Sequence, residues 1–260
     1  SPNAKGSIII PHSVNHQSHE YIITSISESS FKNNQNIKSI DFPSNSELRS
    51  ICNEAFSSSS LESLTIPSKV QLLKEGWCSG TCNLVNFTIS PDNKYYKNYD
   101  DKFIVAKSDQ SKNDFDLLIF SRRNIEEVNI PSTIKEISSF AFSDCYNLKT
   151  VKFSIDSNLN FLGKGSFAGS SIVNISIPST VRSIGDCCFS CCFYLKSILL
   201  QDDSELLSIG KDAFDGTSID SLFIPSKLAD LKEGWCNGTS KLNKITIAED
   251  NKRYKYIEDK

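Results

Sequence analysis

Three histidines near the start of the chain are the first residues that could do chemistry. His12, His16 and His19 are the only histidines in 260 residues, and they form the pattern H-x-x-x-H-x-x-H. Imidazole nitrogens are common zinc ligands. However, the segment is rich in Ser and Asn, has no helical pattern and lacks the glutamate of the zinc-protease motif. We therefore expect a solvated loop, with a metal site as the alternative.

A cluster of thiols is the second candidate. The segment 187–192 reads C-C-F-S-C-C and contains one C-x-x-C pair, Cys188 and Cys191. A structural zinc site normally needs a second pair at suitable spacing, which the sequence does not offer. The chain has nine cysteines, an odd number. We expect mostly unpaired, buried thiols, and we keep a disulfide and a metal or redox site as alternatives.

Phosphate chemistry and acid–base catalysis have no support in the sequence. Gly163-Lys164-Gly165 lacks the spacing and the Ser/Thr partner of a P-loop, so it is interpreted as a structural turn. No set of groups for nucleophilic or acid–base catalysis can be assembled from local sequence. We predict a protein that is not an enzyme, with no cofactor, no metal and no small-molecule substrate.

Composition excludes further classes. Charged residues make up 23% of the chain and the formal net charge is −3, whereas nucleic-acid binding calls for a basic patch. No run approaches the roughly 18 apolar residues of a membrane span. The first residues do not form a signal-peptide pattern, and the chain contains no Met. We expect the chain to be a fragment of a longer protein.

A repeated template dominates the sequence and must position any functional group. Residues 125–142 read I-E-E-V-N-I-P-S-T-I-K-E-I-S-S-F-A-F, and residues 172–189 read I-V-N-I-S-I-P-S-T-V-R-S-I-G-D-C-C-F. Residues 61–73 and 219–231 repeat the frame L-x-x-I-x-I-P-S-x-V-x-x-I. An aromatic residue follows each time, giving the series Phe31, Phe56, Trp77, Phe142, Phe167, Phe189, Phe214 and Trp235.

The aromatic positions are spaced by alternating long and short steps. The steps are 25 and 21 residues from Phe31, then 25, 22, 25 and 21 from Phe142, all within the range of about 20–29 of leucine-rich repeats. Long steps carry a polar turn, as at 154–158 and 201–205, where short steps carry Pro-Ser. In addition, residues 61–102 match residues 219–260 at an offset of 158. The chain therefore grew by duplication of a block of several repeats.

Each position of the frame has a physical interpretation. L-x-x-I-x-I predicts a short strand with apolar residues on one face, and the following Pro ends the strand. V-x-x-I and the aromatic point inward from the opposite wall, and stacked repeats then share one core. In this frame Cys188 takes the small inner position of Ala55 and Ala141, and Cys192 takes that of Cys145. The alternative, a β-sandwich, does not keep one template over so many units.

The frame resembles the BspA-like class of leucine-rich repeats, and residues 130–148 match it most closely. The resemblance extends from about Ile8 to the end of the chain. It implies a solenoid of short parallel strands in one curved sheet, with short turns or helices and extended segments opposite. It also implies a cell-surface or secreted protein that adheres to host cells, matrix or other microbes. The sequence departs from the pattern at Trp77 and Trp235, and in the segment 90–124.

The departing segment 90–124 is predicted to be an inserted β-hairpin. Residues 102–107 and 115–120 are expected to form strands around the polar turn 108–114. Tyr95, Tyr96 and Tyr99 precede them, either as an exposed aromatic patch for a partner or as residues that pack the hairpin onto the solenoid. The expected divisions are a partial repeat or loop (1–20), block 1 (21–89), the hairpin (90–124), block 2 (125–248) and the start of a second, truncated insertion (249–260).

The exposed face of the predicted sheet is the expected binding surface. The residue between the last two apolar positions of each strand forms a column: Asp41, Thr65, Thr88, Asn129, Lys152, Ser176, Leu199, Phe223 and Thr246. Leu199 and Phe223 break its polar character in adjacent repeats, as partner-binding anchors do, although stray surface residues or cover from a loop are the alternative. We therefore name Leu199, Phe223, Lys152 and Asn129 as candidate binding residues.

Two functional classes remain open at this point. The first is an adhesion or recognition ectodomain that binds a protein or a glycan on another cell or in the matrix, with possible self-association. The second is an intracellular, cytoplasmic interaction scaffold with the same solenoid. Three N-x-S/T sequons, at Asn86, Asn174 and Asn237, are interpreted as chance matches unless the protein is secreted. Glycans at Asn86 or Asn174 would obstruct the open face of the sheet.

Overall fold

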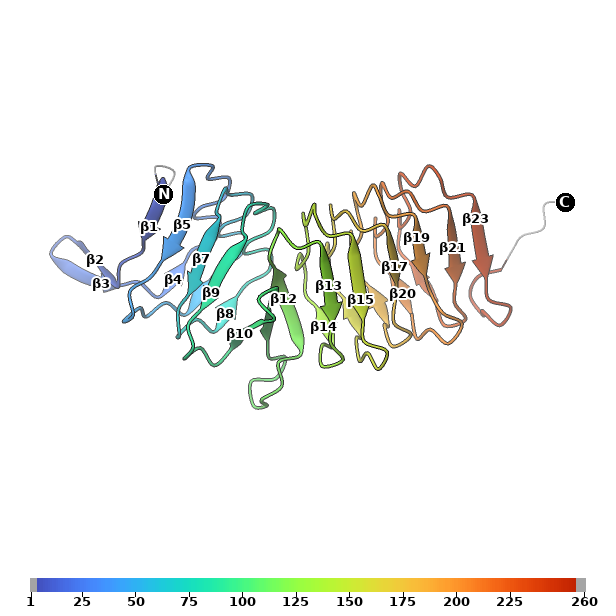
Figure 1. Ribbon diagram of the computed structural model, residues 1–260, viewed down its shortest axis with the longest axis horizontal. Helices are drawn as coiled ribbons and strands as arrows, with labels where there is room; N and C mark the ends of the chain where they lie inside the picture. Colours follow the sequence, from blue (N-terminus) through green and yellow to red (C-terminus); the bar gives the residue numbers. More distant parts are fainter. Residues whose placement is uncertain (1–3, 256–260) are drawn as a thin grey trace. The chain divides into compact units, whose positions relative to one another are not determined.

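The computed structural model describes residues 4–255 and divides into two compact units. Within the described residues, unit 1 comprises 4–115 and 120–124, and unit 2 comprises 116–119 and 125–255. The rows of short arrows in Figure 1 are the parallel strands of the repeats. The predicted leucine-rich-repeat solenoid is thus confirmed, and each unit is described here by itself.

The front strands form where the frame L-x-x-I-x-I places apolar side chains on alternate positions. In unit 1 they are β1 (Gly6–Ile9), β5 (Ile37–Asp41), β7 (Ser63–Ile66) and β9 (Asn86–Ile89), paired in parallel in that order. In unit 2 they are β13 (Glu127–Ile130), β15 (Thr150–Phe153), β17 (Asn174–Ser176) and β19 (Ser197–Leu199). A separate pair follows, β21 (Ser221–Ile224) with β23 (Lys244–Ile247). The front sheet of unit 2 is therefore interrupted between β19 and β21.

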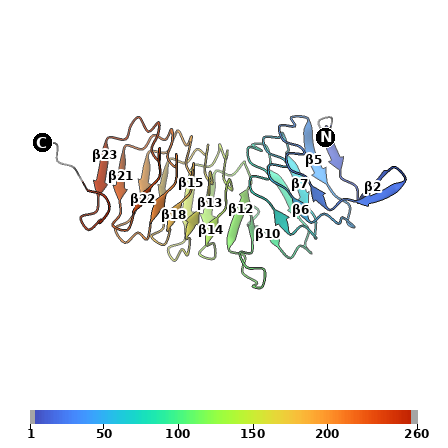
Figure 2. The same ribbon diagram turned by 180° about the vertical axis from the view of Figure 1, so that it is seen from behind.

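The opposite wall is more regular than the sequence suggested, since the V-x-x-I segments pair into back ladders. Unit 1 has β4 (Ser25–Ile26), β6 (Ser50–Ile51) and β8 (Leu72–Leu73). Unit 2 has β14 (Glu136–Ile137), β16 (Phe161–Leu162), β18 (Ser183–Ile184), β20 (Ser208–Ile209) and β22 (Asp230–Leu231), several of which are labelled in Figure 2. Their inward residues, such as Ile137 and Leu162, are fully buried. Residues 4–255 contain no helix, so the opposite wall consists of turns and short strands.

The core between the two walls is a row of stacked aromatic rings. In unit 2 the centroids of Phe167 lie 5.0 Å from Phe142 and 5.4 Å from Phe189, and those of Phe189 and Phe214 lie 5.8 Å apart. All four side chains are fully buried. This row is the feature predicted from the aromatic spacing, and stacking each ring on the next keeps consecutive repeats in contact.

A second row, of glycines, follows the back ladder of unit 2. A Cβ atom on Gly185 would lie 2.8 Å from the backbone carbon of Gly163, and one on Gly210 would lie 2.5 Å from that of Gly185. Each glycine therefore allows the backbone of one repeat to approach that of the previous one. Gly163-Lys164-Gly165 belongs to this row, as a structural turn should, and Gly165 adopts a left-handed φ of 56°.

The N-terminal segment corrects the expectation of a solvated loop around the histidines. β2 (Ser13–His16) and β3 (His19–Ile22) form an antiparallel hairpin in which His16 pairs with His19. Gln17 and Ser18 close it with positive φ angles of 48° and 65°, which match the right-handed twist of the strands. The sequence hid this turn because it lacks the usual Asn-Gly or Gly pair. The partial repeat is present as β1, which pairs with β5.

The segment that departs from the repeat pattern contains three strands. The two predicted strands are present as β11 (Phe103–Ala106) and β12 (Leu117–Ser121). An additional strand, β10 (Tyr96–Tyr99), pairs antiparallel with β11 around Asp100 and Asp101. Within unit 2, Leu117 and Leu118 of β12 pair with Glu136 and Ile137, so this strand starts the back ladder. Part of the second expected insertion, residues 256–260, lies outside the described residues.

Candidate recognition surface

The predicted column of outward side chains is present on the front strands. The registered partners are Thr65 with Thr88, Asn129 with Lys152, Ser176 with Leu199, and Phe223 with Thr246. Thr150 pairs with Asn174, which places Lys152 level with Ser176. Neighbouring strands lie about 4.8 Å apart. In unit 2 these side chains therefore form a continuous line from Asn129 to Leu199.

The candidate binding residues differ in how far they reach into solvent. Asn129 and Lys152 are exposed, and 58% of Leu199 is exposed. Phe223 is only partly exposed and lies on the separate pair β21–β23. Leu199 is thus the free apolar side chain of this column, with Phe223 beyond the break in the sheet.

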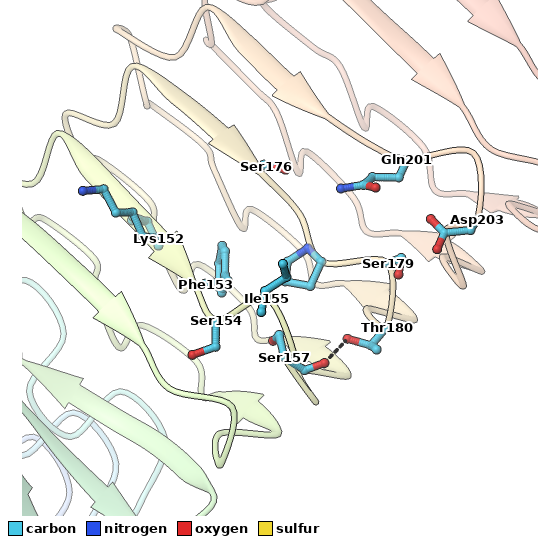
Figure 3. A pocket seen from close by; sticks show the side chains of 12 residues that line it. Lys152, Phe153, Ser154, Ile155, Ser157, Ser176, Ser179, Thr180, Gln201 and Asp203 are labelled. Atoms are coloured by element: carbon cyan, nitrogen blue, oxygen red, sulfur yellow. Dashed lines mark hydrogen bonds between the residues drawn. The ribbon is translucent and has the colours of Figure 1, made fainter.

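A hollow opens at the carboxyl ends of β15, β17 and β19, beside the column (Figure 3). Its volume is about 670 Å³. The long turns 154–158 and 201–205 stand on either side, and the short turn that begins at Pro178 lies between them. The middle turn is shorter than its neighbours and leaves a space between them. The sequence alternation of long and short repeats therefore produces the hollow.

Several of the polar side chains that line the hollow have no partner among the residues that the structure describes. Lys152, Ser176, Ser179, Gln201 and Asp203 line it, and none of them makes a side-chain hydrogen bond or ion pair to another residue of the 4–255 range. Figure 3 shows Gln201 and Asp203 on one side and Phe153 and Ile155 on the other.

The remaining lining residues give the hollow an apolar wall and a fixed floor. Phe153 is half-buried, Ile155 is fully exposed, and Pro178 lies between the two long turns. By contrast, the Thr180 hydroxyl donates to the carbonyl oxygens of Ser157 and Leu159, at 3.2 and 2.7 Å. These bonds fix the middle turn to the preceding long turn, so the free polar groups sit on a fixed backbone.

The three tyrosines before the hairpin do not form one exposed patch. Tyr96 is buried, and its hydroxyl accepts a hydrogen bond of 2.9 Å from the backbone N–H of Leu73. Burial raises the pKa of Tyr96 to about 12. Tyr99 is 39% exposed but stacks on Phe103, with centroids 4.9 Å apart. Tyr96 packs the segment onto the repeats, because its position in β10 faces inward.

Tyr95 lines a second, smaller hollow in unit 1, of about 380 Å³. This hollow also lies at a short turn, next to Ser68 and Lys69, beside the longer turn at Asp92. Its charged lining residues are three cations and one acid: Arg49, Lys69, Lys94 and Asp92. Both hollows lie beside a Pro-Ser turn, but they differ in charge.

The thiols follow the repeat frame. Cys145, Cys188 and Cys192 are fully buried at inner positions, as the frame predicted. In the described part of the chain, which includes all nine cysteines, there is no disulfide. Burial raises the pKa of Cys188 far above the ordinary value and that of Cys192 to about 11. These thiols stay protonated near neutral pH and act as small apolar side chains.

Nothing in the described residues groups three or more His, Cys, Asp or Glu side chains as a metal site. Two of the three histidine rings are tied to backbone carbonyls instead. His12 Nδ1 lies 2.9 Å from the oxygen of Asn45, and His19 Nδ1 lies 2.9 Å from the oxygen of Gln17. Residues 4–255 also offer no helix that could cross a membrane.

Sequence comparison decides the family. The sequence model of the BspA type leucine rich repeat region matches residues 11–100 and 115–243, in six copies. The chain belongs to the BspA-type leucine-rich repeat family. Between the two matched ranges, residues 101–114 fall in the segment that departs from the repeat pattern. No curated protein matches the chain.

Solved structures confirm the leucine-rich repeat fold. A leucine rich cell surface protein from Faecalibacterium prausnitzii superposes with a TM-score of 0.77 at 22% identity, covering 94% of this chain and 60% of its own length. A leucine-rich repeat protein from Eubacterium ventriosum gives 0.70 at 22% identity, with coverages of 86% and 70%. The pneumococcal vaccine antigen PcpA gives 0.57 at 17% identity, with coverages of 96% and 73%. This BspA-type chain is therefore a repeat protein with an architecture suited to interaction.

Proposed function

We propose that this chain is a non-catalytic recognition module of a cell-surface or secreted protein, and that it binds a macromolecule on another cell or in the matrix. Binding uses the front face of unit 2. The observation that carries the proposal is the exposed Leu199, whose registered partner Ser176 lines the hollow. An exposed apolar side chain beside unpartnered polar groups is the composition of an interface centre with its polar surroundings.

The test is binding of the purified chain to fixed animal cells, fixed bacteria and purified matrix proteins. The variant Leu199→Ala/Phe223→Ala removes apolar contact area from the front face. Leu207→Ala is the matched control, because Leu207 is 47% exposed but precedes the back strand β20. The proposal expects weaker binding by the double variant, with a melting temperature that is lowered only slightly, and normal binding by the control. Equal binding by all three proteins would refute the front face as the binding surface.

One observation favours a second candidate, an intracellular interaction scaffold. None of the nine cysteines, all of which lie in the described region, is joined in a disulfide, and unpaired thiols are typical of reducing compartments. Labelling intact cells of the source organism with a membrane-impermeant amine reagent distinguishes the two. Labelled protein supports the surface module, whereas labelling only after lysis supports the scaffold.

A further inference from the structure

The large hollow of unit 2 has the composition of a saccharide site. We infer that it binds a neutral sugar residue of a glycan. This inference rests on the proposed recognition function and names the class of its ligand. Its volume of about 670 Å³ falls within the range of about 300–1,000 Å³ of small-ligand pockets. The inference comes from three features: the hydrogen-bonding groups, the apolar wall and the charge balance.

The hydrogen-bonding groups suit a ligand that carries many hydroxyls. A sugar hydroxyl both donates and accepts, so it needs partners of both kinds. Gln201 offers an amide donor and acceptor, Asp203 two acceptor oxygens, and Ser176 and Ser179 hydroxyls that do either, while Lys152 donates. All five side chains are free of protein partners in the region the structure describes. A ligand therefore does not have to displace an existing internal bond.

The apolar wall suits the other surface of a sugar ring, where C–H groups gather on one face. Phe153 and Ile155 stand across the hollow from the polar groups of Gln201 and Asp203. Pro178 adds apolar surface to the lining. Ile155 is fully exposed and belongs to the long turn 154–158, which flanks the hollow. Covering it with a sugar face removes apolar surface from water.

The charge balance separates this ligand from the other small groups a hollow could take. Lys152 contributes one positive charge and Asp203 one negative charge. A phosphate or sulfate would face the Asp203 carboxylate, and a polycation would face Lys152. The smaller hollow of unit 1, with Arg49, Lys69 and Lys94 against Asp92, does not share this balance. The neutral ligand is therefore assigned to unit 2 alone.

The experiment measures binding of the purified chain to an array of immobilised glycans, followed by titration of the free sugars that score. The variant Gln201→Ala/Asp203→Ala removes the polar side of the hollow. Asp92→Ala is the matched control, because it removes an exposed acid that lines the other hollow. We expect the double variant to lose about tenfold or more in affinity, Ile155→Ala to lose severalfold, and the control to bind normally. All the substituted side chains are outside the core, and thermal unfolding checks that the fold is intact.

Three outcomes would overturn the inference. The first is unchanged glycan binding by the double variant. The second is glycan binding that Asp92→Ala abolishes instead. The third is no glycan binding by a chain that still binds cells or matrix proteins, which leaves the proposed recognition function standing with a protein ligand. Failure to bind glycans, cells and matrix proteins alike would refute both proposals.

Discussion

The rings of Phe142 and Phe167 lie parallel, at an interplanar angle of 1° and a centroid separation of 5.0 Å. These residues occupy the same position in consecutive repeats, 25 residues apart. Each ring thus packs on the next repeat, and the front surface stays in register because the core beneath it does. The stability of this row can be tested residue by residue.

Replacing a ring within the row should be costly. Phe167 stacks on both neighbours and is fully buried, so Phe167→Ala is expected to destabilise the chain by about 3–5 kcal/mol through a cavity and lost contact. Phe193→Ala is the matched control, because Phe193 is 64% exposed. Its cost should stay within about 0.5 kcal/mol. Urea unfolding of both variants measures the difference, and equal costs would contradict the stacked core.

The glycine row predicts sensitivity to a single methyl group. A Cβ on Gly185 would lie 2.8 Å from the backbone of Gly163 and Lys164, so Gly185→Ala should cost about 1–3 kcal/mol through overpacking. Ser138 occupies the equivalent place after the back strand β14 and already carries a Cβ. Ser138→Ala is therefore the control and should be nearly neutral. Thermal unfolding compares the two variants. A neutral Gly185→Ala would show that the repeats do not approach so closely.

Replacing Glu136 is expected to stabilise the chain in a pH-dependent way. Burial, reinforced by the nearby Asp116 carboxylate, raises the pKa of Glu136 above its ordinary value of 4.5. The folded chain binds this proton more tightly than the unfolded chain does. Stability is therefore lost as the pH rises through the folded pKa, and the penalty persists at neutral pH. Glu136→Gln should raise the melting temperature at pH 7, with no gain at pH below about 4.

Glu47 is the control for that measurement, because its replacement should change the melting temperature at pH 7 in the opposite direction. Its hydrogen bond with Lys69 lowers the pKa of Glu47, so its contribution to stability is present at neutral pH and is lost as the pH falls. Glu47→Gln should lower the melting temperature slightly at pH 7 and have no effect in acid. The same sign for both variants at pH 7 would contradict the electrostatic account.

The cysteines are expected to fall into two classes of reactivity, buried and unreactive or exposed and reactive. Burial raises the pKa of Cys78 to about 12 and that of Cys192 to about 11, so their reactive thiolate form is scarce at pH 8. Cys191 is exposed. A thiol-reactive probe followed by mass spectrometry should label Cys191 in the native chain within minutes, and Cys78 and Cys192 only after unfolding. Rapid native labelling of Cys192 would place it outside the core.

The repeat sequence predicts the fold because its constraints are local and repeated. The spacing from Phe142 to Phe214 indicates one ring per repeat, and the structure stacks those rings. The hairpin at His16 and His19 could not be predicted, because Gln17 and Ser18 are not usual turn residues at positive φ. The break between β19 and β21 was equally hidden, since the template continues unchanged across it.

The binding surface could be predicted only in part. The column was predicted, because the strand period fixes which side chains point outward, and Leu199 is exposed as expected. The hollow was not predicted. The sequence feature that indicates it is the long–short–long alternation of turns around Pro178. Tyr96 was ambiguous because a four-residue strand alternates faces, and its buried position depends on a bond to Leu73, a residue 23 positions away.

The most direct test of the recognition surface is site-specific photo-crosslinking. A photoreactive phenylalanine analogue is placed at Leu199 on the front face or at Leu207 on the back wall, and each protein is irradiated while bound to the cells or matrix protein that it recognises. We predict a covalent adduct from position 199 and none from position 207. Adducts from position 207 alone, or from neither position in a chain that binds, would contradict recognition through the front face.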